Sequence, residues 1–233
     1  MRKIRRSHER GQADYGWLKT KYSFSFSDYY DPEHMGFSVL RVINEDYIAG
    51  GGGFPPHPHR DMEIITYVME GALEHKDSMG NTAVMKPGDV QRMSAGTGVR
   101  HSEFNHSSTE RVHLLQIWLL PQRVGIEPSY GQKSFADRIG QQALTLVASP
   151  TAAQGSIAIN QDVNLFVGKM KKDQIHELNL SSGRKMWIQV VQGSLQVDDT
   201  KLQEGDALAV SDENYFKLMA SEENEFLLFD LPQ

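Results

Sequence analysis

The sequence has no cysteine among its 233 residues, and this absence narrows the chemistry that any site can perform. Without cysteine the chain can form neither disulfide bonds nor thiolate metal sites. Histidine and carboxylate side chains are then the only strong metal ligands available.

Long apolar runs are also missing. The most apolar stretch, near Leu114 to Leu120, is interrupted by Gln116 and is much shorter than the ~20 residues that a membrane helix requires. The basic residues of the first ten positions are followed by polar residues where an export signal needs an apolar core. We therefore expect a cytoplasmic protein with no membrane partner.

Charge of one sign is not in large excess, because the formal net charge is −6 and both signs are mixed along the chain. A dedicated nucleic-acid-binding domain is usually basic, so we expect no nucleic-acid partner. The sequence has neither a glycine-rich phosphate loop ending in Lys-Ser/Thr nor a Gly-x-Ser-x-Gly turn. These absences disfavour nucleotide-driven and serine-hydrolase chemistry.

Sustained helical periodicity is scarce, and short runs rich in Val, Ile, Tyr and Phe alternate with Gly, Pro, Asn and Asp. This pattern predicts a mostly β protein with a hairpin turn at 77–81. The segment Ser134 to Gln142 is the exception, and we predict a short helix there. The clearest predicted strands are 37–43, 63–69, 113–119, 186–191 and 225–229.

The sequence contains an internal repeat. Residues 65–74 resemble residues 188–196 when Gly71 and Gly193 are aligned, and a second glycine turn follows each copy, at Gly88 and at Gly205. We therefore predict two related β-domains in tandem, at 1–120 and 151–233. The Pro- and Gly-containing stretch 121–150 is predicted to be the connector, with the short helix inside it.

Two pairs of potential metal ligands stand about forty residues apart. His57 and His59 are separated by one residue, as are His101 and Glu103, and residues at i and i+2 of a strand point to the same face. A single His-x-His pair in a β-rich chain is often only a polar patch on the surface. Two such pairs beside glycines favour one site if their strands are neighbours, and that ligand set suits Fe(II), Ni(II), Cu(II), Mn(II) or Zn(II).

Glu63 competes with Glu103 for the carboxylate role, because it lies four residues after His59. We prefer Glu103, since its strand already carries His101 on the same face. Glu63 would then support the ligands indirectly or form an ordinary salt bridge. His8 and His34 lie in terminal or turn-like contexts, and three other histidines lack a partner two residues away on a strand: His75, His106 and His113. We predict that these five are structural and that His176 is a partly exposed polar residue.

The motifs resemble those of a known superfamily. Gly51 to His59 is similar to the first cupin motif, and Gly88 to Asn105 is similar to the second, with Ser94 where the common pattern has proline. More narrowly, 24–32, His57–Arg60, 94–98 and 101–103 resemble the bacterial pirin family along the whole chain.

This resemblance implies an all-β bicupin fold of two tandem jelly-roll β-barrels, with one divalent metal ion held by His57, His59, His101 and Glu103. The expected metal is Fe(II), with Ni, Cu, Mn or Zn as alternatives. The second copy has lost its ligands, because counting from the glycine turns places Asn179, Ser181, Leu218 and Ala220 at the four ligand positions.

The resemblance also implies a function, since several pirins show quercetin 2,3-dioxygenase activity. We expect a small aromatic substrate and O2, with Glu103 both ligating the metal and serving as the catalytic base. Phe37, Phe54 and Trp118 are candidates for holding a flat aromatic molecule. The alternative is a metal-tuned binding protein that docks to a regulatory or metabolic protein partner.

Overall fold

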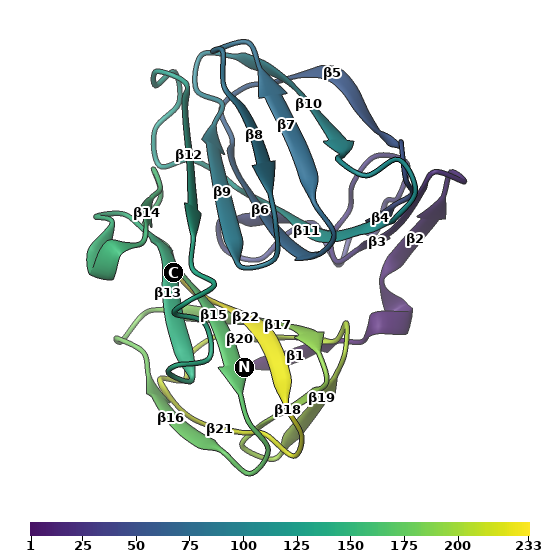
Figure 1. The fold of residues 1–233 in the computed structure, drawn as a ribbon. Coiled ribbons are helices and arrows are strands. Elements are labelled where there is room, and N and C mark those ends of the chain that lie inside the picture. Colours follow the sequence, from purple (N-terminus) through teal and green to yellow (C-terminus); the bar gives the residue numbers. More distant parts are fainter. The chain divides into compact units, whose positions relative to one another are not determined.

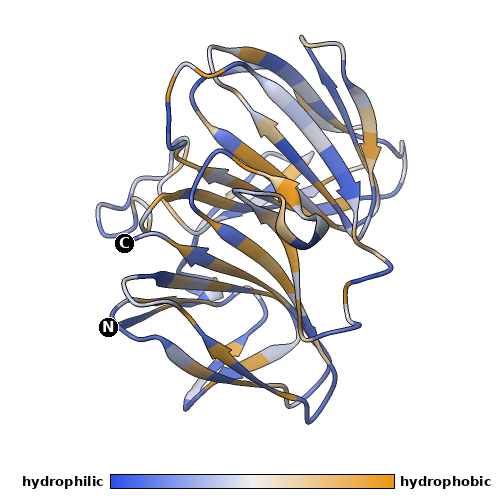
Figure 2. Ribbon diagram, turned by 90° about the vertical axis from the view of Figure 1, so that its left-hand side faces the viewer, coloured by the Kyte–Doolittle hydropathy of each residue, from blue (hydrophilic) through white to orange (hydrophobic).

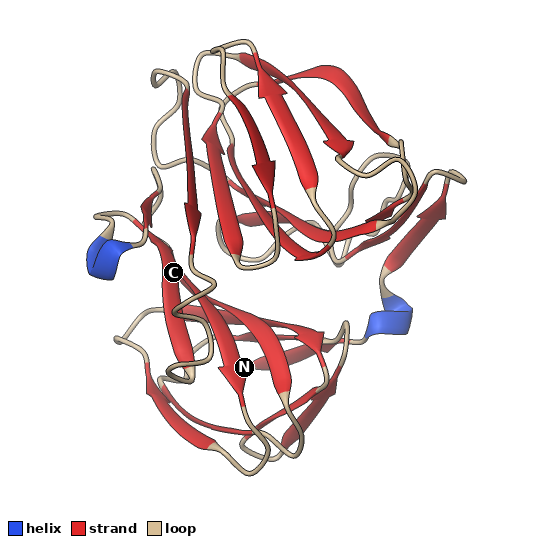
Figure 3. Ribbon diagram, viewed as in Figure 1, coloured by secondary structure: helices blue, strands red, loops and turns tan.

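The computed structural model describes all residues, 1–233, and its regular secondary structure is almost entirely β-strand (Figure 3). Its only helical segments are two 3-10 turns, η1 (Ser7–Glu9) and η2 (Ala153–Gly155). None of its helical segments has the length and apolar character needed to cross a bilayer. The predicted all-β class is confirmed.

The chain forms two compact units. The N-terminal unit comprises Gly11–Ala136 and Ile159–Gln161, and the C-terminal unit comprises Met1–Arg10, Asp137–Ala158 and Asp162–Gln233. Figure 2 shows hydrophobic residues concentrated along the strands, whereas most connecting loops are hydrophilic.

The N-terminal unit contains a seven-stranded and a four-stranded sheet (Figure 1). Apolar residues of both sheets, such as Val68, Leu114 and Leu73, pack in one cluster between them. The larger sheet has the order β12-β9-β6-β11-β4-β3-β2 and the smaller one β5-β10-β7-β8. The strands are β2 (Gly11–Asp14), β3 (Leu18–Tyr22), β4 (Leu40–Ile48), β5 (Gly53–His59), β6 (Glu63–Glu70), β7 (Leu73–Asp77), β8 (Thr82–Met85), β9 (Asp89–Ser94), β10 (Val99–Asn105), β11 (Val112–Leu119) and β12 (Ser129–Ser134).

The C-terminal unit repeats this arrangement, with sheets β1-β20-β17-β22-β15-β13-β14 and β16-β21-β18-β19. Each unit is therefore a two-sheet jelly-roll sandwich, and the predicted internal repeat is confirmed as a repeat of topology. Its strands are β1 (Arg2–Arg5), β13 (Leu144–Ser149), β14 (Ile157–Ala158), β15 (Asn164–Met170), β16 (Ile175–Asn179), β17 (Lys185–Gln192), β18 (Ser194–Val197), β19 (Thr200–Gln203), β20 (Ala207–Val210), β21 (Tyr215–Met219) and β22 (Asn224–Leu231).

The N-terminal segment differs from the sequence-based grouping. Strand β1 pairs antiparallel with β20, with Ile4 opposite Leu208, so the first residues of the chain complete a sheet built from its last third. Ile4 also packs against the apolar core of the C-terminal unit. A pairing between residues some two hundred positions apart leaves no local trace in the sequence.

The predicted helix at Ser134 to Gln142 is wrong. Ser134 ends strand β12, and the buried Phe135 donates its backbone N–H to the carbonyl of Gly88. The following residues form turns, and Gly140 has a positive φ of 85°. The hydrogen bond of Phe135 fixes the first residues of this segment, and Gly140 adopts a left-handed conformation. Too few residues remain between them to nucleate a helix.

Candidate metal centre

Strands β5 and β10 bring three histidines together at the edge of the four-stranded sheet. Strand β5 tolerates Pro55, Pro56 and Pro58 because an edge strand needs hydrogen-bond donors on one side only. His57 lies directly opposite His101 in the antiparallel register. The ring centroids of His57 and His59 are 4.8 Å apart, those of His57 and His101 4.5 Å, and those of His59 and His101 4.8 Å. We call these three residues the imidazole cluster.

The imidazole cluster has a ring nitrogen available to a metal, although Nδ1 of His57 contacts the carbonyl of Pro55 at 2.8 Å. The Nε2 atom of His101 is buried and has no hydrogen-bond partner. Burial, followed by the neighbouring imidazoles, lowers the pKa of His59 to about 4 and that of His101 to about 3. Both rings are therefore neutral at pH 7, which is the form that binds a metal. An unpaired buried nitrogen within a cluster of three imidazoles fits a divalent transition metal.

Glu103 is buried near His101, but its carboxylate is engaged with the larger sheet. The amide Nε2 of Gln116 donates to Oε1 at 3.2 Å and to Oε2 at 2.9 Å, and the hydroxyl of Thr66 lies 3.5 Å from Oε1. Glu103 belongs to a second group of potential ligand atoms, formed with His75 and His101, whose members lie within 4.8 Å of one another. His101 is thus common to both groups, and the four predicted ligands do not form one set in this conformation.

His75, which we predicted to be merely structural, lies at the centre of a buried hydrogen-bond network. Its Nδ1 is 3.3 Å from Nδ1 of His101 and accepts from Nε2 of Gln91 at 3.0 Å, while its Nε2 is 3.1 Å from Oδ2 of Asp77. Its ring stacks on Tyr130 with centroids 4.9 Å apart. The sequence held a signal for this role, because Asp77 stands two residues after His75, as in the other two pairs.

Glu63 contributes to neither group of potential ligands. It is fully buried, and its carboxylate accepts hydrogen bonds from the backbone N–H of Asn160 at 3.0 Å and from its side-chain amide at 3.4 Å. Glu63 therefore anchors the short segment Ile159–Gln161 within the N-terminal unit. Neither direct ligation of a metal nor an ordinary salt bridge describes this arrangement. Indirect support of the ligands by Glu63 stays a prediction.

Two of the three aromatic residues expected to hold substrate adjoin the imidazole cluster. The ring of Trp118 is 5.0 Å from that of His59, and the ring of Phe54 is 6.2 Å from that of His57. Phe37 instead forms a backbone bridge to Leu40. The cluster thus has apolar, aromatic surroundings on two sides.

Comparisons with known proteins agree with this fold. A family model described as Pirin matches residues 3–119, and one described as Quercetinase C-terminal cupin domain matches residues 146–231. The chain is 49% identical over 229 residues to a quercetin 2,3-dioxygenase of Escherichia coli K12, covering 98% of both chains. The chain belongs to the pirin family. The family resemblance and the bicupin fold predicted from the motifs are confirmed.

Two further relatives of this chain are also pirins or pirin-like. A pirin-like protein of Caulobacter vibrioides is 40% identical over 222 residues, covering 94% of this chain and 95% of that protein. The crystal structure of the bacterial pirin YhhW of Escherichia coli in complex with nickel(II) superposes with a TM-score of 0.95 at 49% identity, covering 100% and 99% of the two chains. A pirin of the same fold thus binds a divalent transition metal.

The second cupin unit of this pirin has apolar residues at the counterparts of the ligand positions. Val197 lies four residues after Gly193 and pairs with Leu218, just as His75 lies four residues after Gly71 and pairs with Glu103. Leu218 is therefore the counterpart of Glu103. By the same register the counterparts of His57, His59 and His101 are Leu178, Leu180 and Phe216.

The predicted counterparts Asn179, Ser181, Leu218 and Ala220 were thus out of register by one or two residues. Counting from the glycine turns failed because the segment from Gly205 to Phe216 is two residues shorter than that from Gly88 to His101. The conclusion that the second copy has no ligand set does not change. Leu180, Phe216 and Leu218 belong to the apolar core of the C-terminal unit.

A row of polar side chains crosses the interior of the N-terminal unit and has no equivalent in the other one. Its members are cross-strand neighbours in the larger sheet, in the order Gln91, Thr66, Gln116, Asn44 and Tyr22. We call this set the polar row. It supports the site directly, because Gln91 contacts His75, and both Thr66 and Gln116 contact Glu103.

The counterparts of the polar row in the C-terminal unit are all apolar. Gln91 and Leu208 each lie three residues after the second glycine turn, at Gly88 and Gly205. Following the cross-strand pairs from Leu208 gives the remaining counterparts, which are Ile188, Leu228, Phe166 and Leu146. The fold therefore does not require polar residues at these positions.

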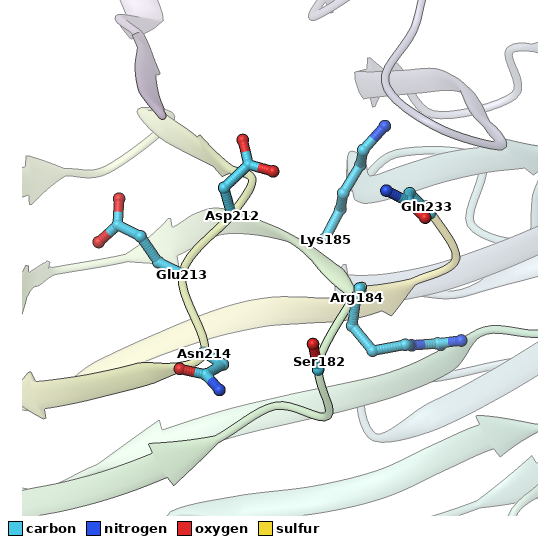
Figure 4. Close-up of a pocket in the computed structure, with 8 residues that line it drawn as sticks. Ser182, Arg184, Lys185, Asp212, Glu213, Asn214 and Gln233 are labelled. Carbon is cyan, nitrogen blue, oxygen red and sulfur yellow. The ribbon is translucent and has the colours of Figure 1, made fainter.

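The C-terminal unit has a polar surface pocket of about 340 Å³, shown in Figure 4. Asp212, Glu213 and Asn214 face Ser182 and Arg184 across it. The guanidinium of Arg184 is already paired with Asp162 and Asp230 at 2.7 and 2.6 Å. No histidine lines this pocket, so it offers no counterpart of the imidazole cluster.

Proposed function

We propose that this pirin binds one divalent transition metal ion, Fe(II), through His57, His59, His101 and Glu103, and cleaves a flavonol or a similar ortho-hydroxy carbonyl aromatic with O2. The observation that carries this proposal is the imidazole cluster, in which three histidine rings converge and a buried nitrogen of His101 has no partner. The name of the Escherichia coli relative, quercetin 2,3-dioxygenase, supports the reaction type.

A bound divalent metal would supply Lewis acidity toward the hydroxyl and carbonyl oxygens of the substrate. Side chains of the protein contribute the proton transfer and the orientation of the substrate. Glu103 accepts the proton of the substrate hydroxyl at a carboxylate oxygen, and the donation from Gln116 to both oxygens orients that carboxylate. Trp118 and Phe54 exclude water from the cluster and provide flat surfaces for an aromatic ring.

The decisive experiment is anaerobic purification with elemental analysis, followed by an oxygen-uptake assay with quercetin for each restored metal. In Glu103→Gln the histidines should still hold metal, but turnover per bound metal should fall by roughly 10²–10⁴-fold, the usual effect of losing a positioned base. Glu74→Gln is the matched control, because Glu74 lies on the neighbouring strand β7 and pairs with Lys76 away from the cluster.

Equal turnover per bound metal in the wild type and Glu103→Gln would contradict the assignment of Glu103 as base. Absence of oxygen uptake with every flavonol and metal would contradict the dioxygenase itself.

A further inference from the structure

A buried chain of hydrogen bonds runs from His101 through His75 to Asp77. Nδ1 of His101 lies 3.3 Å from Nδ1 of His75, and Nε2 of His75 lies 3.1 Å from Oδ2 of Asp77. The side chains of His75 and Asp77 are both fully buried. Burying a carboxylate and an imidazole costs free energy, which favours a role for them in the neighbouring site.

The direction of this hydrogen-bond chain is set at Asp77. An ionised carboxylate only accepts hydrogen bonds. Asp77 accepts from the backbone N–H groups of Met79 and Asn81 and from the side-chain amide of Asn81. The nitrogen of His75 that faces this carboxylate, Nε2, is therefore the one that carries a proton.

Two donors converge on the other ring nitrogen of His75. The amide Nε2 of Gln91 lies 3.0 Å from Nδ1 of His75, and an amide nitrogen only donates. Nδ1 of His75 is thus an acceptor, so the neighbouring Nδ1 of His101 carries its proton. The lone pair of His101 is left on Nε2, which is buried and has no hydrogen-bond partner. Tyr130 stacks on the ring of His75 and opposes its rotation.

His57 has its proton on the same ring nitrogen for a different reason. Its Nδ1 lies 2.8 Å from the backbone carbonyl of Pro55, and a carbonyl oxygen only accepts. Nδ1 of His57 is therefore the donor, which leaves the lone pair on Nε2. Two of the three rings of the imidazole cluster are thus held through Nδ1, and both keep Nε2 for a metal.

The C-terminal unit shows that the fold does not require this hydrogen-bond chain. Asp199 stands two residues after the counterpart of His75, as Asp77 does after His75, but its side chain is 95% exposed. The other positions of the chain, those of His75, Gln91 and His101, are occupied there by buried apolar residues: Val197, Leu208 and Phe216. The buried chain is therefore specific to the unit that contains the imidazole cluster.

We propose that Asp77 and His75 are positioning residues, which hold His101 in the tautomer with its proton on Nδ1 so that Nε2 presents its lone pair to the metal. In naming a metal as the recipient, the inference rests on the proposed function. The tautomer itself does not depend on the metal. Without this chain His101 would revert to the tautomer with the proton on Nε2, which predominates in free histidine and cannot ligate through that nitrogen.

The tautomers can be observed by NMR of metal-free protein containing isotope-labelled histidine, because the shift of a ring nitrogen depends on whether it carries a proton. In the wild type, His101 should be protonated on Nδ1 and His75 on Nε2. Asp77→Asn should reverse both, since the new amide donates to Nε2 of His75. The oxygen that remains in this variant still accepts from the backbone of Met79 and Asn81.

A matched control makes the same chemical change in another buried pair of a carboxylate and a histidine. Oε1 of Glu45 lies 3.0 Å from Nε2 of His113, and both side chains are largely buried. Glu45→Gln should leave the tautomers of His75 and His101 unchanged.

Nickel(II) titrated into the metal-free protein tests the consequence for the site. The dissociation constant should rise by roughly 10–100-fold in Asp77→Asn and in His75→Leu, the usual effect of losing the partner of a ligating histidine. His75→Asn should recover most of the affinity, because its side-chain oxygen accepts from Nδ1 of His101. Both His75 variants lose the stacking on Tyr130, so a merely structural role predicts equal losses. If His75→Leu does not fold, Asp77→Asn, which preserves volume, still decides.

A proton on Nε2 of His101 in the metal-free wild type would overturn this proposal, as would unchanged tautomers or wild-type nickel(II) affinity in Asp77→Asn. These outcomes are distinct from those of the oxygen-uptake test. A wild type with the expected tautomers but no oxygen uptake would remove the proposed reaction and keep this role of Asp77 and His75. Oxygen uptake by a wild type with the opposite tautomer of His101 would do the reverse.

Discussion

His101 occupies the junction between the two groups of potential ligands. Its Nδ1 faces His75, whose Nε2 is in turn 3.1 Å from Asp77, and its own Nε2 is buried without a partner. If Asp77 accepts the proton of His75, then Nδ1 of His75 is an acceptor and Nδ1 of His101 is the donor. That tautomer leaves the lone pair of His101 Nε2 free for a metal, which is the usual effect of the residues that hold a ligating histidine.

Removing the imidazole of His101 should therefore remove the metal. We expect His101→Ala to contain less than a tenth of the wild-type metal per folded chain, because His101 belongs to both groups of potential ligands and its loss leaves neither group complete. His106→Ala is the control, since His106 lies just beyond strand β10 with its side chain half exposed beside Glu74. Elemental analysis of both proteins measures the effect, and tightly bound stoichiometric metal in His101→Ala would refute the ligand set.

The buried imidazoles should also make the stability of the metal-free protein depend on pH. Burial lowers the pKa of His59 to about 4 and that of His101 to about 3, whereas both titrate near 6.5 in the unfolded chain. Between these values the unfolded state binds more protons than the folded state. The free energy of unfolding should thus fall as the pH drops below 6.5, by up to about 1.4 kcal/mol per pH unit for each imidazole, and level off near pH 3.

Urea denaturation of metal-free protein at a series of pH values tests this expectation. His101→Gln should flatten the profile between pH 6.5 and pH 3 relative to the wild type. An identical slope in the two proteins would mean that His101 is not a buried neutral imidazole in the folded state.

At the scale of single elements, short strands position the candidate site because neighbouring strands fix where their side chains meet. The antiparallel register of β5 and β10 sets His57 opposite His101, and that of β10 and β7 sets Glu103 opposite His75. A register shift occurs between His101 and Glu103 on the β5 side. The extra residue lies in β5 between Phe54 and His57, so Phe54 rather than a residue two before His57 lies opposite Glu103.

Strand β1 has a structural role that can be tested by deletion. It covers the edge of β20, Ile4 packs on the core of the C-terminal unit, and Arg2 pairs with Glu213 at 2.8 Å. Removing residues 1–5 should destabilise that unit by about 2–4 kcal/mol, through lost apolar burial and lost ladder hydrogen bonds.

Tryptophan fluorescence can assign that loss to one unit. Trp187 is the only tryptophan of the C-terminal unit, because the other two are Trp17 and Trp118. With Trp17→Phe and Trp118→Phe in both proteins, the unfolding transition reported by Trp187 should move to lower urea concentration after the deletion. An unchanged transition would place the first residues outside the cooperative unit of Trp187.

On the scale of the whole molecule, the two units share one topology but differ in their interiors. The polar row, His75 and Glu103 are buried in the N-terminal unit, whereas their counterparts in the C-terminal unit form an apolar core. Buried polar groups stabilise a fold less than well-packed apolar side chains of similar size. The contrast indicates that the N-terminal interior is built for binding and chemistry, while the C-terminal interior is built for stability.

The sequence by itself determined the strand-rich class, the internal repeat and the pairing of ligands on strands. These features depend on local rules: residues two apart share a face of a strand, and glycine turns connect the strands of hairpins. His57 and His59 could therefore be placed on one face without any knowledge of the fold. His75 with Asp77 obeys the same rule, so the prediction that His75 lacks a partner two residues away was wrong.

Only the tertiary structure decided which side chains meet across strands. Loop lengths and bulges set the register, and a shift of one residue moves every side chain to the other face. For this reason the counterparts of the ligands in the second copy were predicted out of register, and the contacts of Glu103 with Gln116 and of His101 with His75 could not be predicted from the sequence. The pairing of β1 with β20 and the polar row likewise join residues far apart in the chain, and no local pattern specifies such contacts.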